Sequence, residues 1–154
     1  MKVTVITISD RASRGIYEDL SGPKIVEILK EQIENVKIER VIVPDEKPEI
    51  LKALQNANAN FIITTGGTGI SERDVTPEIC AEFCDKELPG IAEILRAESY
   101  KETPMAMLSR GYAGMKNKTI IVNFPGSVKA VTLCTKVIIP MMKHAIKMFQ
   151  GEGH

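Results

Sequence analysis

Short apolar runs alternate with amphipathic segments along this chain. The runs are rich in β-branched residues and end in polar residues or glycine, which is typical of buried strands; they cover residues 2–8, 36–43, 60–65 and 118–124. The amphipathic segments predict helices, of which the first begins at Pro23 and the others cover residues 48–57, 77–86, 90–101 and 128–149. Strands that alternate with helices predict an α/β fold, a three-layer α/β/α sandwich with a mainly parallel central sheet.

Two segments carry no regular pattern. Residues 9–21 are polar and predict a loop, whereas residues 106–115 fit a strand or a hairpin that ends at Gly114. Pro140 lies inside the last predicted helix, where a proline can introduce a kink. The chain has 154 residues, the usual size of one domain, and neither a linker nor a repeat divides it. We therefore expect a single domain over residues 1–154.

The third predicted strand runs into the turn Gly66-Gly67-Thr68-Gly69, which carries little side-chain bulk. Such a turn lets backbone N–H groups approach a ligand and form a concave site for an anion such as phosphate. Thr76 and Pro77 follow as the expected N-cap and first residue of the next helix. The turn matches neither a Walker A loop nor a Rossmann fingerprint, and a plain strand-to-helix connection is the alternative.

Polar residues and glycines follow each of the four predicted strands. Ligands of open parallel sheets bind beyond the carboxyl ends of the strands, so these segments should meet at one edge. They are residues 7–11, 43–46, 66–74 and 123–127. Asp45 and Asp74 are candidate metal ligands, because Mg²⁺ prefers one or two carboxylates together with phosphate oxygens. A turn residue and a charge at a helix N-terminus are the alternatives for these two acids.

Charge and cysteine content constrain the partners of the chain. Twenty basic residues balance twenty acidic ones, so no strong positive field favours nucleic acid. The sequence shows no signal peptide and no apolar run of about 18 residues, so we expect a soluble, cytoplasmic protein that is not a membrane protein. Cys80, Cys84 and Cys134 form no metal or redox motif and are expected to pack in the interior.

Together these motifs resemble those of the molybdopterin-binding fold, and within it the molybdopterin adenylyltransferase family of the MogA type, which is closely related to the MoaB type. The resemblance runs over roughly residues 3–149 and rests on the segments Thr7–Ser13, Pro44–Glu46, Thr65–Gly69, Arg73–Glu78, Pro89–Gly90, Thr103–Arg110 and Pro125–Ser127. Some members of the MoaB type lack the two acids that this chain keeps as Asp45 and Asp74.

The resemblance implies a reaction of molybdenum cofactor biosynthesis, in which AMP passes from Mg-ATP to the terminal phosphate of molybdopterin and pyrophosphate is released. It implies that Asp45 and Asp74 are the catalytic acids and hold Mg²⁺. The residues implied to bind the substrates and their phosphates are Thr7, Ser9, Gly66, Gly67, Thr68, Gly69, Asn123, Pro125, Gly126 and Ser127. Further candidates are Asp19, Arg73, Ser109 and Arg110. The product would pass to a molybdate-inserting partner of the MoeA type.

Three other functions stay open at this point. A non-catalytic molybdopterin-binding protein of the MoaB type would bind the pterin without consuming ATP. A different enzyme on the same fold, such as the domain that opens the competence-damage nicotinamide-nucleotide proteins, is the second alternative, and a structural interaction module is the third. The family also implies a homotrimer. The segments Met105–Leu108 and Met141–Met142 could either form its contacts or fill the core.

Overall fold

One six-stranded sheet forms the centre of the structure, with the strand order β2-β1-β3-β6-β5-β4. The computed structural model describes residues 1–152; residues 153–154 of the predicted domain lie outside that range. The parallel strands are β1 (Lys2–Ile8), β2 (Lys37–Val43), β3 (Phe61–Thr65) and β6 (Thr119–Phe124). The short β5 (Ala113–Lys116) and β4 (Lys86–Glu87) add two antiparallel pairings at one edge. The sheet is therefore mainly parallel, as predicted.

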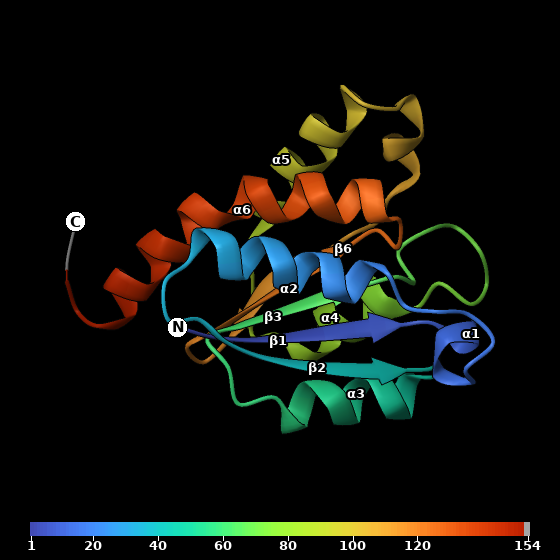
Figure 1. The fold of residues 1–154 in the computed structure, drawn as a ribbon, viewed down its shortest axis with the longest axis horizontal. Coiled ribbons are helices and arrows are strands. Elements are labelled where there is room, and N and C mark those ends of the chain that lie inside the picture. Colours follow the sequence, from blue (N-terminus) through green and yellow to red (C-terminus); the bar gives the residue numbers. More distant parts are fainter. Residues whose placement is uncertain (153–154) are drawn as a thin grey trace.

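Helices cover both faces of this sheet (Figure 1). On one face lie α2 (Ser21–Gln32), α5 (Pro89–Tyr100) and α6 (Val128–Phe149), and on the other lie α3 (Lys47–Asn56) and α4 (Thr76–Phe83). Side chains alternate along β3, so that Phe61 and Ile63 join the core under α2 and α6 while Ile62 joins the core under α3 and α4. This burial on both faces explains the unbroken apolar runs and confirms the predicted three-layer α/β/α sandwich.

Several element boundaries differ from the prediction. The segment 9–21, predicted to be a loop, contains the short helix α1 (Asp10–Ser13), which is capped by the Ser9 hydroxyl. The next helix, α2, begins at Ser21 and not at Pro23. The helix α4 ends at Phe83 and not at residue 86, because the chain turns into β4 to pair with β5.

The ambiguous segment 106–115 divides between two elements. Its first part lies in η1 (Pro104–Leu108), a 3₁₀ helix whose cap residue is Thr103. Its second part enters β5, which forms an antiparallel hairpin with β6 and continues past Gly114 to Lys116. The predicted strand is thus right only for the end of the segment.

The last helix, α6, continues through Pro140 over its 22 residues. Met142, on the inner face of this helix, is fully buried, and Met141 packs against the same core. Met142 therefore fills the core and Met141 packs at its margin, which answers for these two methionines the question that the sequence left open. None of the helices in residues 1–152 combines the length and hydrophobicity needed to cross a membrane.

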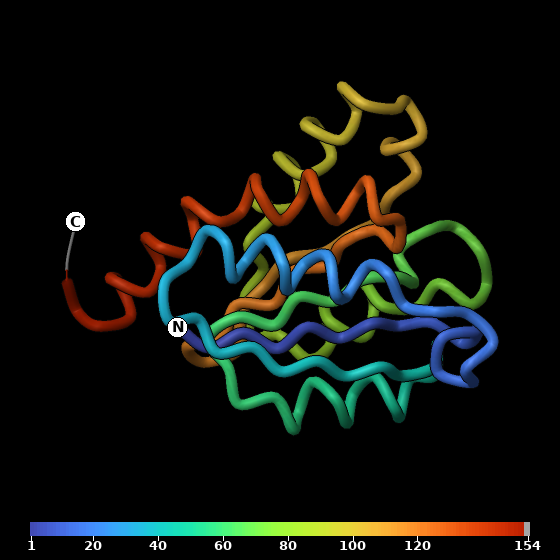
Figure 2. Tube along the Cα trace, viewed as in Figure 1, coloured from blue at the N-terminus to red at the C-terminus, as the bar shows by residue number. Residues whose placement is uncertain are grey.

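The carboxyl ends of the parallel strands meet at one end of the sheet. Thr7 of β1 is level with Thr65 of β3, which is level with Phe124 of β6. Figure 2 shows the β3–α4 loop (green) and α1 (blue) at this end, away from the N-terminus. From β1 the chain passes to β2 on one side and then to β3 on the other. Such a change of direction is where open α/β sheets bind their ligands.

Candidate active site

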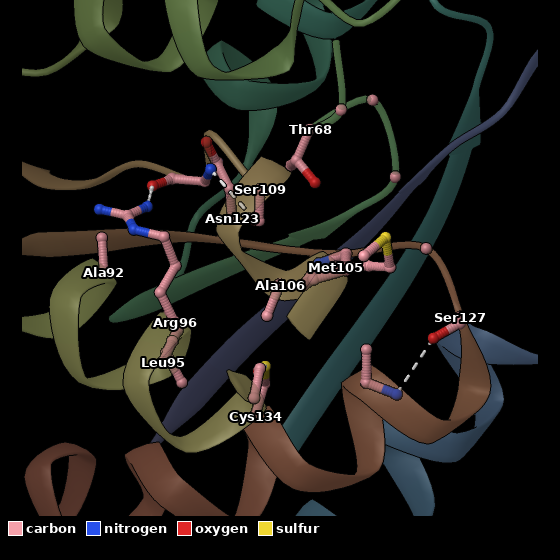
Figure 3. Close-up of a pocket in the computed structure, with 18 of the residues that line it drawn as sticks. Thr68, Ala92, Leu95, Arg96, Met105, Ala106, Ser109, Asn123, Ser127 and Cys134 are labelled. Carbon is pink, nitrogen blue, oxygen red and sulfur yellow. Dashed lines mark hydrogen bonds between the residues drawn. The ribbon is translucent and has the colours of Figure 1, made fainter. Parts of the chain in front are cut away.

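A cavity of about 380 Å³ opens at the carboxyl ends of β3 and β6 (Figure 3). The β3–α4 loop contributes Gly66–Gly69 and Asp74, and the β6–α6 turn contributes Pro125–Ser127. The rest of the wall comes mainly from α5, η1, the segment after η1 and α6: Ala92, Leu95, Arg96, Ser99, Thr103, Met105, Ala106, Ser109, Gly111, Asn123, Ala130 and Cys134. Segments far apart in the sequence thus bring most of the predicted site residues to one cavity.

The glycine turn folds back onto the start of α4. Gly67 has a φ of 67°, and a Cβ atom placed on it would collide with Thr76 Oγ1 and lie 3.1 Å from Asp45 Oδ1. Thr76 donates its backbone N–H to the oxygen of Gly67 (3.2 Å) and its hydroxyl to the oxygen of Gly66 (3.1 Å). The predicted N-cap role of Thr76 is therefore wrong: it is the first residue of α4, and Val75 precedes it at the cap position.

Asp45 and Asp74 lie beside different residues of the glycine turn. Asp45 Oδ1 approaches Gly67, and Asp74 Oδ2 is 2.8 Å from the position that a Cβ on Gly69 would occupy. Asp74 Oδ2 also accepts hydrogen bonds from the backbone N–H (2.9 Å) and the hydroxyl (2.7 Å) of Ser71. Loops that follow two different strands therefore carry both predicted acids to the same turn.

Asp45 is surrounded by more negative than positive charge. Asp45 Oδ2 accepts the backbone N–H of Asp10 (2.9 Å), while Asp10 Oδ1 accepts the backbone N–H of Asp45 (3.0 Å). Burial raises the pKa of the Asp45 carboxyl, and the charges of Asp10 and Asp74 raise it too, while the hydrogen bond from Asp10 and the charge of Arg73 oppose these effects. A partly buried acid of this kind favours a nearby cation.

The two acids fit Mg²⁺ held together with a phosphate. Within residues 1–152, histidine, cysteine and acidic side chains do not gather in groups of three or more that could enclose a metal ion. Mg²⁺ does not require such an enclosure, because it is commonly bound by one or two carboxylates together with water and substrate phosphates. Asp45 and Asp74 offer this donor set beside the glycine turn.

Thr7, Ser9 and Asp19 lie at a smaller neighbouring cavity of about 230 Å³, which shares Gly66 and Gly126 with the main one. The Thr7 hydroxyl donates to Asp19 Oδ2 (2.7 Å), and the Ser9 hydroxyl caps α1. Asp19 also accepts the backbone N–H of Gly22 (3.0 Å) in the first turn of α2. The structure therefore does not place these three side chains in the main cavity, and each already has a hydrogen-bond partner.

The β6–α6 turn contributes a helix N-terminus to the main cavity. Ser127 caps α6, and its hydroxyl accepts the backbone N–H of Ala130 (3.2 Å). The N-terminus of a helix of this length favours an anion. Asn123 also lines the cavity, and its buried amide donates to Thr64 Oγ1 (2.9 Å) and Cys80 Sγ (3.2 Å). Asn123 therefore supports the cavity wall and joins β6 to β3 and α4.

The candidate cations lie outside the main cavity. Arg73 is 53% exposed and pairs with Asp10 and Glu46, both at 2.9 Å. It thereby ties the β3–α4 loop to the loops after β1 and β2. Arg110 contacts the back of the glycine turn, whereas the neighbouring Ser109 lines the cavity.

The wall formed by α5 was not predicted as part of the site. Ala92 and Leu95 are apolar positions of an amphipathic helix, and the sequence cannot distinguish a cavity wall from the core at such positions. Arg96 Nη1 donates to the oxygen of Gly111 (2.7 Å) between the main cavity and a second surface pocket. Arg96, a charged residue close to these apolar positions, is the sequence feature that could have indicated a site on this helix.

The cysteines pack as expected. Cys80 and Cys134 are buried and Cys84 is half-buried. Burial raises the pKa of the Cys80 thiol to about 12 and that of the Cys134 thiol, at the cavity wall, to about 11. Both thiols are therefore protonated at neutral pH, which makes them poor nucleophiles and metal ligands.

These features define a class of α/β proteins whose ligand cavity lies at the carboxyl edge of a mainly parallel sheet, beside a glycine turn and two carboxylates. Residues 4–144 match the family described as "Probable molybdopterin binding domain". The chain belongs to this family.

Similar proteins come from several bacteria. A molybdopterin adenylyltransferase of Helicobacter pylori strain J99 is 40% identical, over 97% of this chain and 88% of that protein. The crystal structure of the molybdopterin biosynthesis enzyme MoaB from Thermus thermophilus superimposes with a TM-score of 0.87 at 37% identity, over 97% of this chain and 96% of the other. The molybdopterin biosynthesis Mog protein from Mycobacterium ulcerans gives a TM-score of 0.88 at 37% identity, over 96% and 97%.

Proposed function

We propose that this protein is a molybdopterin adenylyltransferase of molybdenum cofactor biosynthesis. The observation that carries the proposal is the placement of Asp45 and Asp74 beside one glycine turn; Asp74 and the turn line a cavity large enough for a small phosphorylated ligand. Relatives about 40% identical over nearly the whole chain carry the same name. The reaction consumes ATP: an oxygen of the molybdopterin phosphate attacks the α-phosphorus, a P–O–P bond forms, and the bond to pyrophosphate breaks.

Each part of the site has a role in this reaction. Residues Gly67–Gly69 of the turn and the N-terminus of α6 bind phosphate groups through backbone N–H groups, while the N–H of Gly66 donates to the oxygen of Phe124 (3.1 Å). Asp45 and Asp74 would hold Mg²⁺, which neutralises the charge of the polyphosphate. The apolar wall of Ala92 and Leu95 excludes water and covers the rest of the ligand. Phosphoryl-type transfer depends on positioning and charge stabilisation and does not need a protein nucleophile.

We expect turnover only when all three components are present. The purified protein, incubated with molybdopterin, ATP and MgCl₂, should release pyrophosphate and form an adenylylated pterin that mass spectrometry detects. Excess EDTA should abolish both signals, since the charge of the two meeting polyphosphates needs a divalent cation in addition to the backbone N–H groups. Tight molybdopterin binding without pyrophosphate release would instead indicate a non-catalytic binding protein of the MoaB type.

The proposed function places the protein in the cytoplasm and upstream of a molybdate-inserting partner of the MoeA type, which would accept the adenylylated pterin. Such a transfer protects an activated intermediate from hydrolysis. Addition of a purified MoeA-type protein and molybdate should therefore consume the adenylylated product.

We also propose a homotrimer, with η1 in the subunit contacts. Met105 and Met107 of η1 are 63% and 68% exposed, unlike the buried Met142, and exposed methionines suit adaptable apolar contacts. Size exclusion with light scattering should give about three times the 17.0 kDa chain mass. Met107→Glu should lower that mass, whereas the control Met148→Glu on α6 should not; a monomer in the unsubstituted protein would refute the trimer.

A further inference from the structure

Arg110 bonds to both ends of the loop that carries Asp74. Its backbone N–H donates to the oxygen of Thr68 (2.9 Å), which fixes the arginine backbone beside the glycine turn. Its guanidinium donates through Nε to the oxygen of Gly69 (2.7 Å) and through Nη2 to the oxygen of Asp74 (2.6 Å). The remaining nitrogen, Nη1, pairs with Glu78 of α4. All three nitrogens of the guanidinium are thus occupied within the protein, and Arg110 does not line the main cavity.

These contacts determine which way the peptide groups of the turn face. In a trans peptide, the carbonyl of one residue and the N–H of the next point in opposite directions, and no cis peptide occurs in residues 1–152. Because the carbonyls of Thr68 and Gly69 point toward Arg110, the N–H groups of Gly69 and Ile70 point away from it. Thr68, Gly69 and Asp74 line the cavity. The arginine therefore holds the side of the loop that faces away from the ligand.

The chain between the two bonded carbonyls is exposed. Residues 70–73 leave the body of the protein, and Ile70 is 71% exposed. Polar contacts hold its second half, where Ser71 bonds to Asp74 and Arg73 pairs with Asp10 and Glu46, but none of these contacts reaches back to Gly69. One planar guanidinium joins the ends through two donors whose spacing is rigid, a geometry that a lysine ammonium on its flexible stem does not reproduce.

We propose that Arg110 is a positioning residue: by joining Gly69 to Asp74 it sets the Asp74 carboxylate and the N–H groups of the glycine turn at the relative positions that adenylyl transfer requires. The inference rests on the proposed function for the reaction, but the arrangement that it explains can be measured without turnover. A displacement of about 1 Å in a site that works by positioning can cost about 100-fold in rate.

Three variants separate this role from a general effect on stability. Arg110→Met removes all side-chain bonds, Arg110→Lys keeps the positive charge near Glu78 but not the rigid bridge, and Glu78→Gln removes only the ion pair. Glu78 is 60% exposed, so the ion pair itself contributes little. We expect kcat for adenylylation to fall about 100-fold in Arg110→Met and at least 10-fold in Arg110→Lys. Glu78→Gln should stay within about twofold of the unsubstituted protein, because it keeps both bonds to the carbonyls.

Amide hydrogen exchange gives a second readout that needs neither substrate nor metal. Peptides covering residues 66–76 should exchange faster in both Arg110 variants than in Glu78→Gln, while peptides from β1 and the α2–α6 core should not change. Unchanged exchange in residues 66–76, or equal loss of kcat in Glu78→Gln and Arg110→Met, would overturn the inference. If the unsubstituted protein shows no turnover, the proposed function fails, and the exchange experiment alone decides the role of Arg110.

Discussion

Asp74→Asn should reduce adenylyl transfer by at least about 100-fold while leaving the fold intact. The carboxylate lies beside Gly69 at the cavity, where it would hold the metal ion against the substrate phosphates. Loss of a charged metal ligand removes several kcal/mol of transition-state stabilisation, and each 1.4 kcal/mol corresponds to about tenfold in rate. Asparagine keeps an oxygen that can accept the hydrogen bonds from Ser71, so the local turn should survive.

The control for this experiment is Glu72→Gln, which removes a neighbouring charge at an exposed position of the same loop. Pyrophosphate release at saturating Mg²⁺ and ATP measures the rate, and a thermal melt measures stability. Turnover of Asp74→Asn close to that of Glu72→Gln would exclude the metal-binding role.

Asp45→Asn should lose activity to a similar extent but should melt no lower than the unsubstituted protein near neutral pH. Burial raises the pKa of Asp45 in the folded state, so ionised Asp45 destabilises the fold at pH values above that raised pKa. The destabilisation declines as the pH falls through the raised pKa and disappears below the ordinary aspartate pKa of about 3.9, where the carboxyl is protonated in both states. Melts of the two proteins should therefore converge with acidification; a variant that melts much lower at pH 7 would contradict this account.

Gly67→Val should weaken ligand binding more than it weakens folding. A Cβ at residue 67 would collide with Thr76 Oγ1 and approach Asp45, and a β-branched residue at a φ of 67° is strained by about 1–3 kcal/mol. Relief of the collision must displace the turn or the acid, and both belong to the proposed phosphate site. We expect calorimetric titration with Mg-ATP to show a dissociation constant raised at least tenfold, or about 1.4 kcal/mol.

Gly15→Val provides the matched control, because Gly15 has a φ of 71° and no atom lies within 4 Å of a Cβ placed there. That variant carries the backbone strain without the collision, so its melting temperature should fall and its affinity should not change. An unaltered dissociation constant in Gly67→Val would show that the glycine turn is only a structural connection.

The sequence predicts the layers of this fold well, since burial on both faces leaves a continuous apolar run at each parallel strand. It misses β4 and η1 for a different reason. Lys86–Glu87 forms a strand only because β5 lies beside it, and η1 is held by the Thr103 cap and by its contacts with α5. Neither element has a periodic pattern of its own, because both depend on neighbours distant in the chain.

The candidate site, like the fold, can be predicted from the sequence only in part. The acids and the glycine turn can be predicted because they follow strands whose carboxyl ends must meet. The positions of Thr7 and Ser9 cannot be predicted in this way. Two cavities adjoin at this edge of the sheet, and side-chain packing decides which of them a strand end faces. Arg110 could be named as a candidate, but its role on the far side of the turn depends on carbonyl directions that the sequence does not contain.

The glycine turn, Asp74, the α5 wall and the N-terminus of α6 line the main cavity within one polypeptide, and Asp45 of the same chain lies against Gly67. Even if subunits meet at η1, whose Met105 and Ala106 line the same cavity, the acids and the glycine turn come from one chain, so we expect each subunit to work independently. A mixed assembly that contains one Asp74→Asn chain would lose only that chain's share of the output, and activity would decline in proportion to the fraction of altered chains. Altered subunits would accordingly not inactivate the intact subunits that assemble with them.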